Sequence, residues 1–492
     1  MRRTPFAALA VVAAAAAMIP GAAPAGASSA APGAPARSTL HWGACPSPVE
    51  AGLQCARLRV PLDYRHPSGR TIRVAVSRLA STDPARKRGV LVVNPGGPGL
   101  PGLPAPNLLK LPRTVRDRYD VIGFDPRGVG QSTPVTCGFD AAQGGVAANP
   151  RSPADAADVA KQAVTAKRLA RQCATSATAD LLPYITTANT ARDMDRIRAA
   201  LGVPRISYYG ESYGTYLGAV YATLFPHRGD RVVLDSSLPP EGYDVAALRS
   251  QAAGFETRFP DFARFAAARP GRYHLGRTPR AVRRTYFRLA ARLDHEPVQG
   301  YDGTTFRVVT AAGIRADSGF ACLAATWHAL DANQPLPCVG GAGGGAYTDN
   351  YPAAYLAVIC GDSRWPRSVA TYQRNVALDR VRYPMYGAFA ANIRPCAFWH
   401  APVEPTVTIT DRGPSTILMV QNLRDPATPL RGALRTRRAL GRRARLLTVD
   451  QGGHVVYLTG SNRCANNAVT DYLATGRRPS HDAYCPAQPA SP

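Results

Sequence analysis

The sequence predicts an α/β fold, in which a mostly parallel sheet with helices on both faces is interrupted by one long insertion. Short continuous apolar runs recur along the chain, and such runs are typical of strands buried on both faces. Helical stretches separate these runs, as expected for strands joined by crossover helices. The rhythm stops after Leu238 and resumes near Ser415, with helical, aromatic and Gly-rich pieces between them.

The elements follow in chain order. Strands are predicted from an alternating segment, 70–79, and from the apolar runs 89–93, 119–124, 205–209, 231–234, 415–420 and 445–449. Helices are predicted over 154–173, 187–201 and 213–225. The resulting division is a leader (1–37), a core in two parts (38–238 and 411–492) and a helical cap or lid (239–410), because large insertions at a sheet edge commonly cover the site.

The N-terminus predicts export. Arg2 and Arg3 precede an apolar stretch, 6–19, that is short for a membrane span and is followed by small residues. We therefore expect a cleaved signal peptide and a secreted protein without stable membrane insertion. The cleavage site stays open between Ala27 and Arg37.

Cysteine usage agrees with export. The ten cysteines form no C-x-x-C pair, and an even number in an exported chain favours disulfides. Pairing each cysteine with its neighbour in the sequence gives one hypothesis among several connectivities: 45–55, 137–173, 322–338, 360–396 and 464–485.

The charge balance does not indicate nucleic-acid binding. The net charge is +26, but the arginines are spread along the chain and no zinc-finger, helix-turn-helix or RNP-like pattern accompanies them. An arginine-biased proteome together with solubility explains most of this charge, and attraction to acidic envelope polymers is the alternative.

The strongest chemical signal is Gly210-Glu211-Ser212-Tyr213-Gly214, between a predicted strand and a predicted helix. This is the setting of a nucleophile elbow, in which the two glycines permit a cramped turn that projects the serine hydroxyl. We therefore predict that Ser212 is a catalytic nucleophile.

A nucleophilic serine needs a base and an orienting carboxylate, which follow it in the order acid, then His, in α/β-hydrolases. Asp425 and His454 each lie just beyond a predicted strand, on the sheet edge expected for Ser212. Asp235, which ends an earlier strand, is the rival acid. Thr428 is either a hydrogen-bond donor to Asp425 or an ordinary turn residue.

The oxyanion that forms during acyl transfer needs donors. The Gly-rich segment 94–99 follows a predicted strand, and the backbone N–H groups of Gly97 and Tyr213 are the predicted pair. The segment 125–132 is interpreted as a scaffold behind this turn. No H-E-x-x-H, Walker or Rossmann glycine pattern is present, so we expect no metal and no organic cofactor.

These motifs together resemble the secreted tripeptidyl aminopeptidases, relatives of prolyl iminopeptidase in the α/β-hydrolase superfamily. The resemblance runs from about His41 to Cys485 and is weakest across the insertion. It implies an α/β-hydrolase fold with a large helical cap, a triad of Ser212, Asp425 and His454, and a peptide substrate with a free N-terminus. The family also includes carboxylesterases.

An aminopeptidase must also bind a protonated amine, and acidic side chains are the natural acceptors. Glu211 is the first candidate, and Glu241, Asp244 and Asp317 of the insertion are others. The lead hypothesis is therefore an exported serine aminopeptidase. The alternatives are a carboxylesterase with the same triad and a non-catalytic envelope-binding protein.

Overall fold

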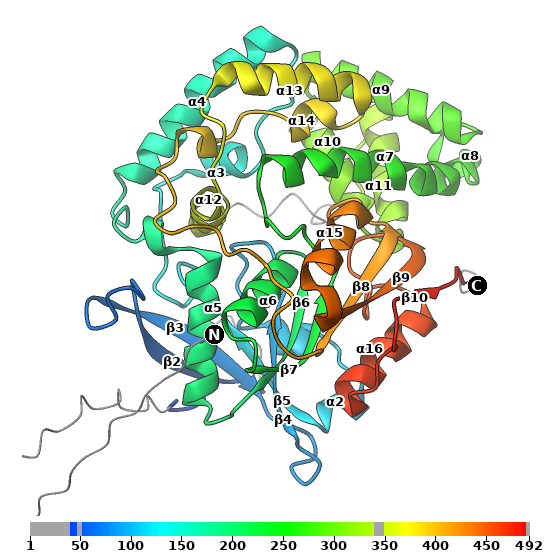
Figure 1. The fold of residues 1–492 in the computed structure, drawn as a ribbon. Helices are drawn as coiled ribbons and strands as arrows, with labels where there is room; N and C mark the ends of the chain where they lie inside the picture. The colour runs from blue at the N-terminus through cyan, green and yellow to red at the C-terminus, as the bar shows by residue number, and fades with distance from the viewer. Residues whose placement is uncertain (1–39, 47–51, 339–348, 489–492) are drawn as a thin grey trace, which may run out of the picture. The chain divides into compact units, whose positions relative to one another are not determined.

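One ten-stranded sheet forms the core, in the strand order β1-β2-β3-β5-β4-β6-β7-β8-β9-β10 (Figure 1). A computed structural model describes residues 40–46, 52–338 and 349–488. The strands are β1 Gly43–Ala44, β2 Gln54–Pro61, β3 Thr71–Leu79, β4 Gly89–Asn94, β5 Tyr119–Phe124, β6 Ile206–Glu211, β7 Gly229–Asp235, β8 Ile417–Arg424, β9 Ala444–Gly452 and β10 Ala483–Cys485. β1, β2 and β3 pair antiparallel, as do β3 and β5, and all later pairs are parallel.

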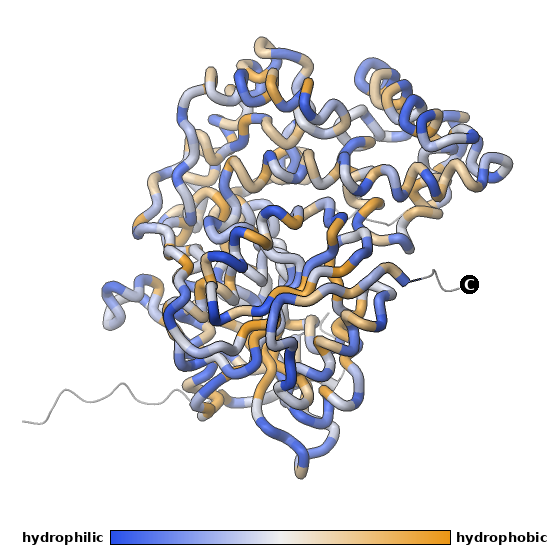
Figure 2. Tube along the Cα trace, turned by 45° about the vertical axis from the view of Figure 1, so that its right-hand side comes forward, coloured by the Kyte–Doolittle hydropathy of each residue, from blue (hydrophilic) through white to orange (hydrophobic). Residues whose placement is uncertain are grey.

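Both faces of the parallel strands are buried, which explains their continuous apolar sequences. In β4, Val90 and Val92 pack into one hydrophobic cluster, whereas Leu91 and Val93 pack into another on the opposite face. Figure 2 shows hydrophobic residues concentrated along the central strands. The fold is therefore the predicted α/β-hydrolase fold.

Helices cover the two faces of the sheet. One face carries α5 Thr187–Ala200, α6 Tyr213–Leu224 and α15 Leu430–Leu440, whose apolar residues join the first cluster. The other face carries α1 Ala105–Leu108, α2 Arg113–Arg116 and α16 Arg463–Thr475. Because the strands of the parallel part run in the same direction, their carboxyl ends share one edge, and this edge faces the cap helices (Figure 1).

The insertion forms a helical cap around an aromatic core. Its helices are α7 Val245–Ala267, α8 Pro270–Tyr273, α9 Pro279–His295, α10 Gly303–Gly313, α11 Phe320–Ala332, α12 Asn350–Asp362, α13 Val369–Arg382 and α14 Gly387–Ala390. Phe259 and Phe262 of α7 lie 6.2 and 5.0 Å, ring centre to ring centre, from Trp327 of α11. Burial of these large rings holds the cap helices together.

Two helices from the N-terminal part of the chain also lie in the cap layer. These are α3 Ala141–Ala148 and α4 Ala156–Ala174 (Figure 1). Val159 and Ala163 of α4 share a hydrophobic cluster with Tyr372 and Val376 of α13. The boundaries at residues 238/239 and 410/411 divide the sequence. That the segments between them form a separate cap domain stays a prediction.

Each predicted strand and helix is present, with ends shifted by a few residues. β1, β2 and β10 are not among the predicted strands: β1 and β10 have only two and three residues, and β2 is an edge-side strand of the antiparallel part that sequence reasoning missed. All five predicted disulfides are confirmed: Cys45–Cys55, Cys137–Cys173, Cys322–Cys338, Cys360–Cys396 and Cys464–Cys485. The predicted leader lies outside the described residues, and within the described ranges no helix has the length and apolar character of a membrane span.

Candidate active site

Ser212 lies in a tight turn between β6 and α6. Its φ of 54° is in the left-handed region, which is costly for a residue with a side chain and is typical of functional sites. The flanking glycines are needed for steric reasons, because a Cβ on Gly210 would lie 2.5 Å from the Gly214 carbonyl oxygen and a Cβ on Gly214 would lie 2.8 Å from Asn94 Oδ1. The predicted elbow geometry is therefore present at Ser212.

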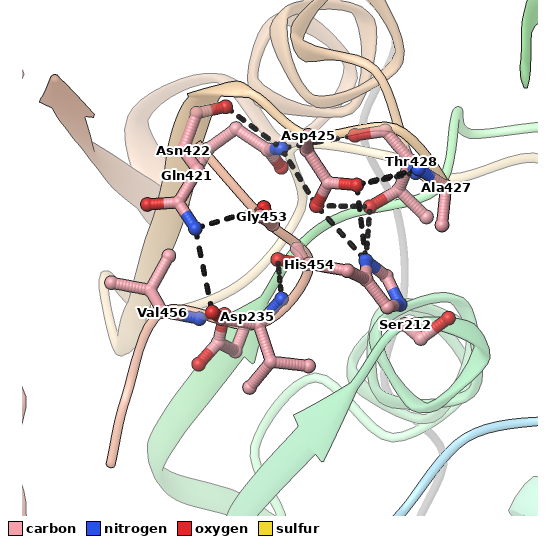
Figure 3. A network of polar contacts seen from close by, with 12 residues as sticks. Ser212, Asp235, Gln421, Asn422, Asp425, Ala427, Thr428, Gly453, His454 and Val456 are labelled. Atoms are coloured by element: carbon pink, nitrogen blue, oxygen red, sulfur yellow. Dashed lines mark hydrogen bonds and ion pairs between the residues drawn. The ribbon is translucent and has the colours of Figure 1, made fainter. Parts of the chain in front are cut away.

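His454 contacts Asp425 through one ring nitrogen. Its Nδ1 lies 3.0 and 3.1 Å from the two carboxylate oxygens of Asp425. Asp425 is buried at the end of β8 and also accepts hydrogen bonds from the Ala427 and Thr428 N–H groups, each at 2.8 Å, and from the Thr428 hydroxyl at 2.9 Å. In Figure 3 the imidazole lies between Asp425 and Ser212.

The electrostatics of this pair favour an ionised carboxylate. Burial by itself raises the pKa of Asp425, but the imidazole and the two backbone N–H donors hold that pKa below its usual value. An ionised Asp425 accepts the Nδ1–H of His454, which leaves Nε2 without its proton and able to receive one.

The structure brings Asp425, not Asp235, to the imidazole. Asp235 is fully buried and accepts hydrogen bonds from the Val456 and Tyr457 N–H groups, both at 2.8 Å, and from the Tyr209 hydroxyl at 3.0 Å. Burial raises the pKa of Asp235 to about 6, despite these donors. Asp235 therefore holds the loop that carries His454 (Figure 3).

The cap also contacts this loop. The His454 N–H donates to the Arg315 carbonyl oxygen at 2.6 Å, directly after α10. A Cβ on Gly453 would lie 2.7 Å from the same oxygen, so the glycine permits the approach. The sequence carried no signal for this contact, because a backbone carbonyl can come from any residue.

The Gly-rich turn after β4 packs against the elbow. A Cβ on Gly96 would lie 2.7 Å from the Glu211 carbonyl oxygen and 3.4 Å from the Tyr213 nitrogen. Gly97 lines the same cavity as Ser212. Behind the turn, Asp125 accepts from the Gly102 and Leu103 N–H groups at 2.8 and 3.0 Å, which agrees with the interpretation of 125–132 as a scaffold.

A cavity of about 400 Å³ opens beside Ser212 and is lined by core and cap residues. Glu211 lies in its wall, where burial and the neighbouring Asp235 raise the Glu211 pKa to about 8. Tyr243, at the start of the cap, also lines it, and burial raises the Tyr243 pKa to about 12 although a hydrogen bond with Ser212 opposes the shift. Sequence reasoning missed Tyr243, because the fold alone brings it to the serine.

The other acidic candidates for amine binding do not line this cavity. Glu241 pairs with Arg435, and Asp317 pairs with Arg258. Asp244 caps α7 by accepting the Ala247 N–H at 2.7 Å. Glu211 is thus the only carboxylate among the described residues in the cavity wall.

Several known proteins are similar to this chain along most of its length. Residues 383–485 match a family described as TAP-like protein. A tripeptidyl aminopeptidase of Streptomyces lividans is 37% identical over 92% of this chain and 87% of its own length. A serine protease of Mycobacterium tuberculosis is 31% identical over 91% of each chain, and a carboxylesterase B of the same organism is 31% identical over 88% of this chain and 86% of its own.

Proposed function

The chain belongs to the tripeptidyl aminopeptidase family, and on this basis we propose that it is an exported serine peptidase that releases tripeptides from the free N-termini of peptides. The observation that carries the proposal is the contact of His454 Nδ1 with both oxygens of the buried Asp425, beside a serine in an elbow turn.

The proposed chemistry is acyl transfer in two steps. Ser212 attacks the carbonyl carbon of the scissile bond while His454 Nε2 takes its proton, and the imidazolium then protonates the leaving amine. Asp425 holds the tautomer and stabilises the imidazolium. The N–H groups of Gly97 and Tyr213 donate to the oxyanion, and water then hydrolyses the acyl-enzyme with His454 as base.

Glu211 is proposed as a substrate contact. It is the one carboxylate among the described residues that line the cavity, and this cavity must also hold the substrate amine. A bound ammonium group stabilises the ionised carboxylate against the effect of burial. If Glu211 binds the substrate amine, Glu211→Gln raises KM for free tripeptides and leaves KM for N-acetylated tripeptides unchanged.

The residues 239–410 are proposed as the cap that limits the substrate to short acyl segments. The contact of Arg315 with the His454 loop supports this role, because it closes one side of the cavity.

Export, with removal of a leader within residues 1–37, is also part of the proposal, and five disulfides suit an oxidising compartment. N-terminal sequencing of the protein from culture medium tests it.

A chromogenic substrate panel tests the function. Free tripeptide anilides are expected to be cleaved, and the N-acetylated forms of the same anilides are expected to be cleaved far more slowly. A fluorophosphonate probe is expected to label the native protein at Ser212, and Ser212→Ala is the matched control. Folded protein that fails to label would favour a non-catalytic binding role.

The second candidate is a carboxylesterase, and the similarity to a carboxylesterase B favours it. The same triad would act on small esters, since the chemistry of acyl transfer is common to both substrates. Rapid hydrolysis of nitrophenyl esters without cleavage of any free tripeptide anilide would support the esterase.

A further inference from the structure

Two arginines lie in the wall of the cavity beside Ser212. Arg315 and Arg394 both line it, together with His454, and Glu211 is the only carboxylate among its described lining residues. Burial raises the pKa of Glu211 to about 8, so without a bound ammonium group that side chain is mostly protonated near pH 7. The cavity wall therefore carries positive charge that the protein itself does not balance.

Arg394 is buried and has no ionic partner within residues 40–46, 52–338 and 349–488. It lies between α14 and the short 3₁₀ helix η3 (Pro395–Phe398), and is 4% exposed. Its Nη1 donates to the Ala148 carbonyl oxygen at 3.0 Å, and its Nε has no hydrogen-bond partner. Arg394 forms no salt bridge with any carboxylate of the described residues. The guanidinium carbon also lies over the ring of Phe389, 5.8 Å from the ring centre. An aromatic face does not replace a carboxylate, so a buried guanidinium without one is costly unless a ligand supplies an acceptor.

The other buried arginines differ from Arg394. Arg127 makes two short hydrogen bonds with Asp193, at 2.6 and 2.7 Å, and Arg258 pairs with Asp261 at 2.5 Å. Arg443, like Arg394, has an unpaired Nε and donates to backbone carbonyl oxygens, but it does not line the cavity. Arg394 thus combines an unsatisfied buried cation with a position in the cavity wall.

Arg315 adds to the positive potential at the other side of the cavity. Its backbone is fixed by the hydrogen bond from His454, and its exposed side chain has no ion-pair partner among the described residues. Arg315 lines the same cavity as Ser212 and Tyr243. A substrate in this cavity lies within the field of both arginines.

We propose that this cavity selects peptides that carry an aspartate or glutamate side chain among the three residues before the scissile bond, with Arg394 as the ionic partner of that carboxylate. The inference rests on the proposed function. A planar guanidinium and a carboxylate form paired hydrogen bonds, which discriminate strongly against a neutral amide of the same shape. Three extended residues span about 10 Å, so the acidic side chain reaches into the cavity from one of three positions.

The experiment compares Glu with Gln in a free Ala-Ala-Ala anilide, one position at a time. At one position the wild-type protein is expected to show kcat/KM for Glu about tenfold or more above that for Gln. Arg394→Met is expected to abolish the ratio, and Arg394→Lys to keep part of it. Arg443→Met, the matched buried arginine outside the cavity, is expected to leave the ratio unchanged.

A ratio below about twofold at all three positions in the wild type overturns the proposal, as does an unchanged ratio in Arg394→Met. The wild-type ratio decides the matter even if Arg394→Met fails to fold. A second readout needs no turnover: Glu-containing tripeptide amides are expected to protect Ser212 from a fluorophosphonate probe at concentrations about tenfold lower than Gln-containing ones. Protection with this preference but no anilide cleavage would refute the peptidase and support the subsite, and equal protection would refute the subsite.

Discussion

Replacing Asp425 with Asn changes one atom of the carboxylate and tests how His454 is held. The Oδ1 position accepts two backbone N–H groups, from Ala427 and Thr428 at 2.8 Å each. The single carbonyl oxygen of Asn is therefore expected at this position, with its NH₂ group at the Oδ2 position, 3.0 Å from His454 Nδ1. A donor there forces the proton of the imidazole onto Nε2, which can then no longer accept the serine proton.

This reversal of the tautomer is expected to lower kcat by a factor on the order of 10⁴ near neutral pH. Asp235→Asn is the matched control, because Asp235 contacts the loop rather than the imidazole, and we expect kcat within about tenfold of the wild type for this loss of hydrogen-bond acceptors. The assay is kcat on a free tripeptide anilide, normalised to folded protein by circular dichroism. Nearly full activity in Asp425→Asn, with the large loss in Asp235→Asn, would refute the assignment.

Three further predictions concern the elbow, the buried carboxyl and a disulfide. Gly214→Val is expected to abolish probe labelling at Ser212, because its Cβ alone would lie 2.8 Å from Asn94 Oδ1; labelling at the wild-type rate would contradict this. The folded pKa of Glu211 is raised to about 8, so its stabilising contribution is complete at low pH and is lost as the pH rises to 8. Between pH 5 and 8 the unfolding free energy of Glu211→Gln, measured by urea titration, should therefore fall by roughly 3 kcal/mol less than that of the wild type. Equal losses would contradict a raised pKa for Glu211. Replacing Cys360 and Cys396 by Ala is expected to cost about 2–5 kcal/mol of unfolding free energy, measured in the same titration, and an unchanged midpoint would show that this bridge is dispensable.

The sequence predicts those parts of the site that depend on local backbone geometry. The elbow needs glycines at 210 and 214 for contacts within a few residues of Ser212, and these are visible in the sequence as a motif. The order of strands also brings Asp425 and His454 to one sheet edge, because parallel strands end there together.

The rest depends on contacts between distant segments. Asp235 and Asp425 both lie at strand ends. Only the path of the His454 loop decides that Asp425 contacts the imidazole, whereas Asp235 accepts a backbone N–H of the loop. Arg394 and Tyr243 reach the cavity through the packing of the insertion, for which the sequence offers only helical and aromatic patterns. The same is true of α4, whose apolar face contacts α13 about 200 residues later in the chain.

The most direct measurement of the central claim is mass spectrometry of a decapeptide incubated with the mature protein, with Ser212→Ala as control. We expect the free decapeptide to lose its first three residues as one tripeptide, the N-acetylated decapeptide to stay intact, and Ser212→Ala to release nothing. Cleavage inside the acetylated peptide, or tripeptide release by the Ser212→Ala variant, would contradict the claim.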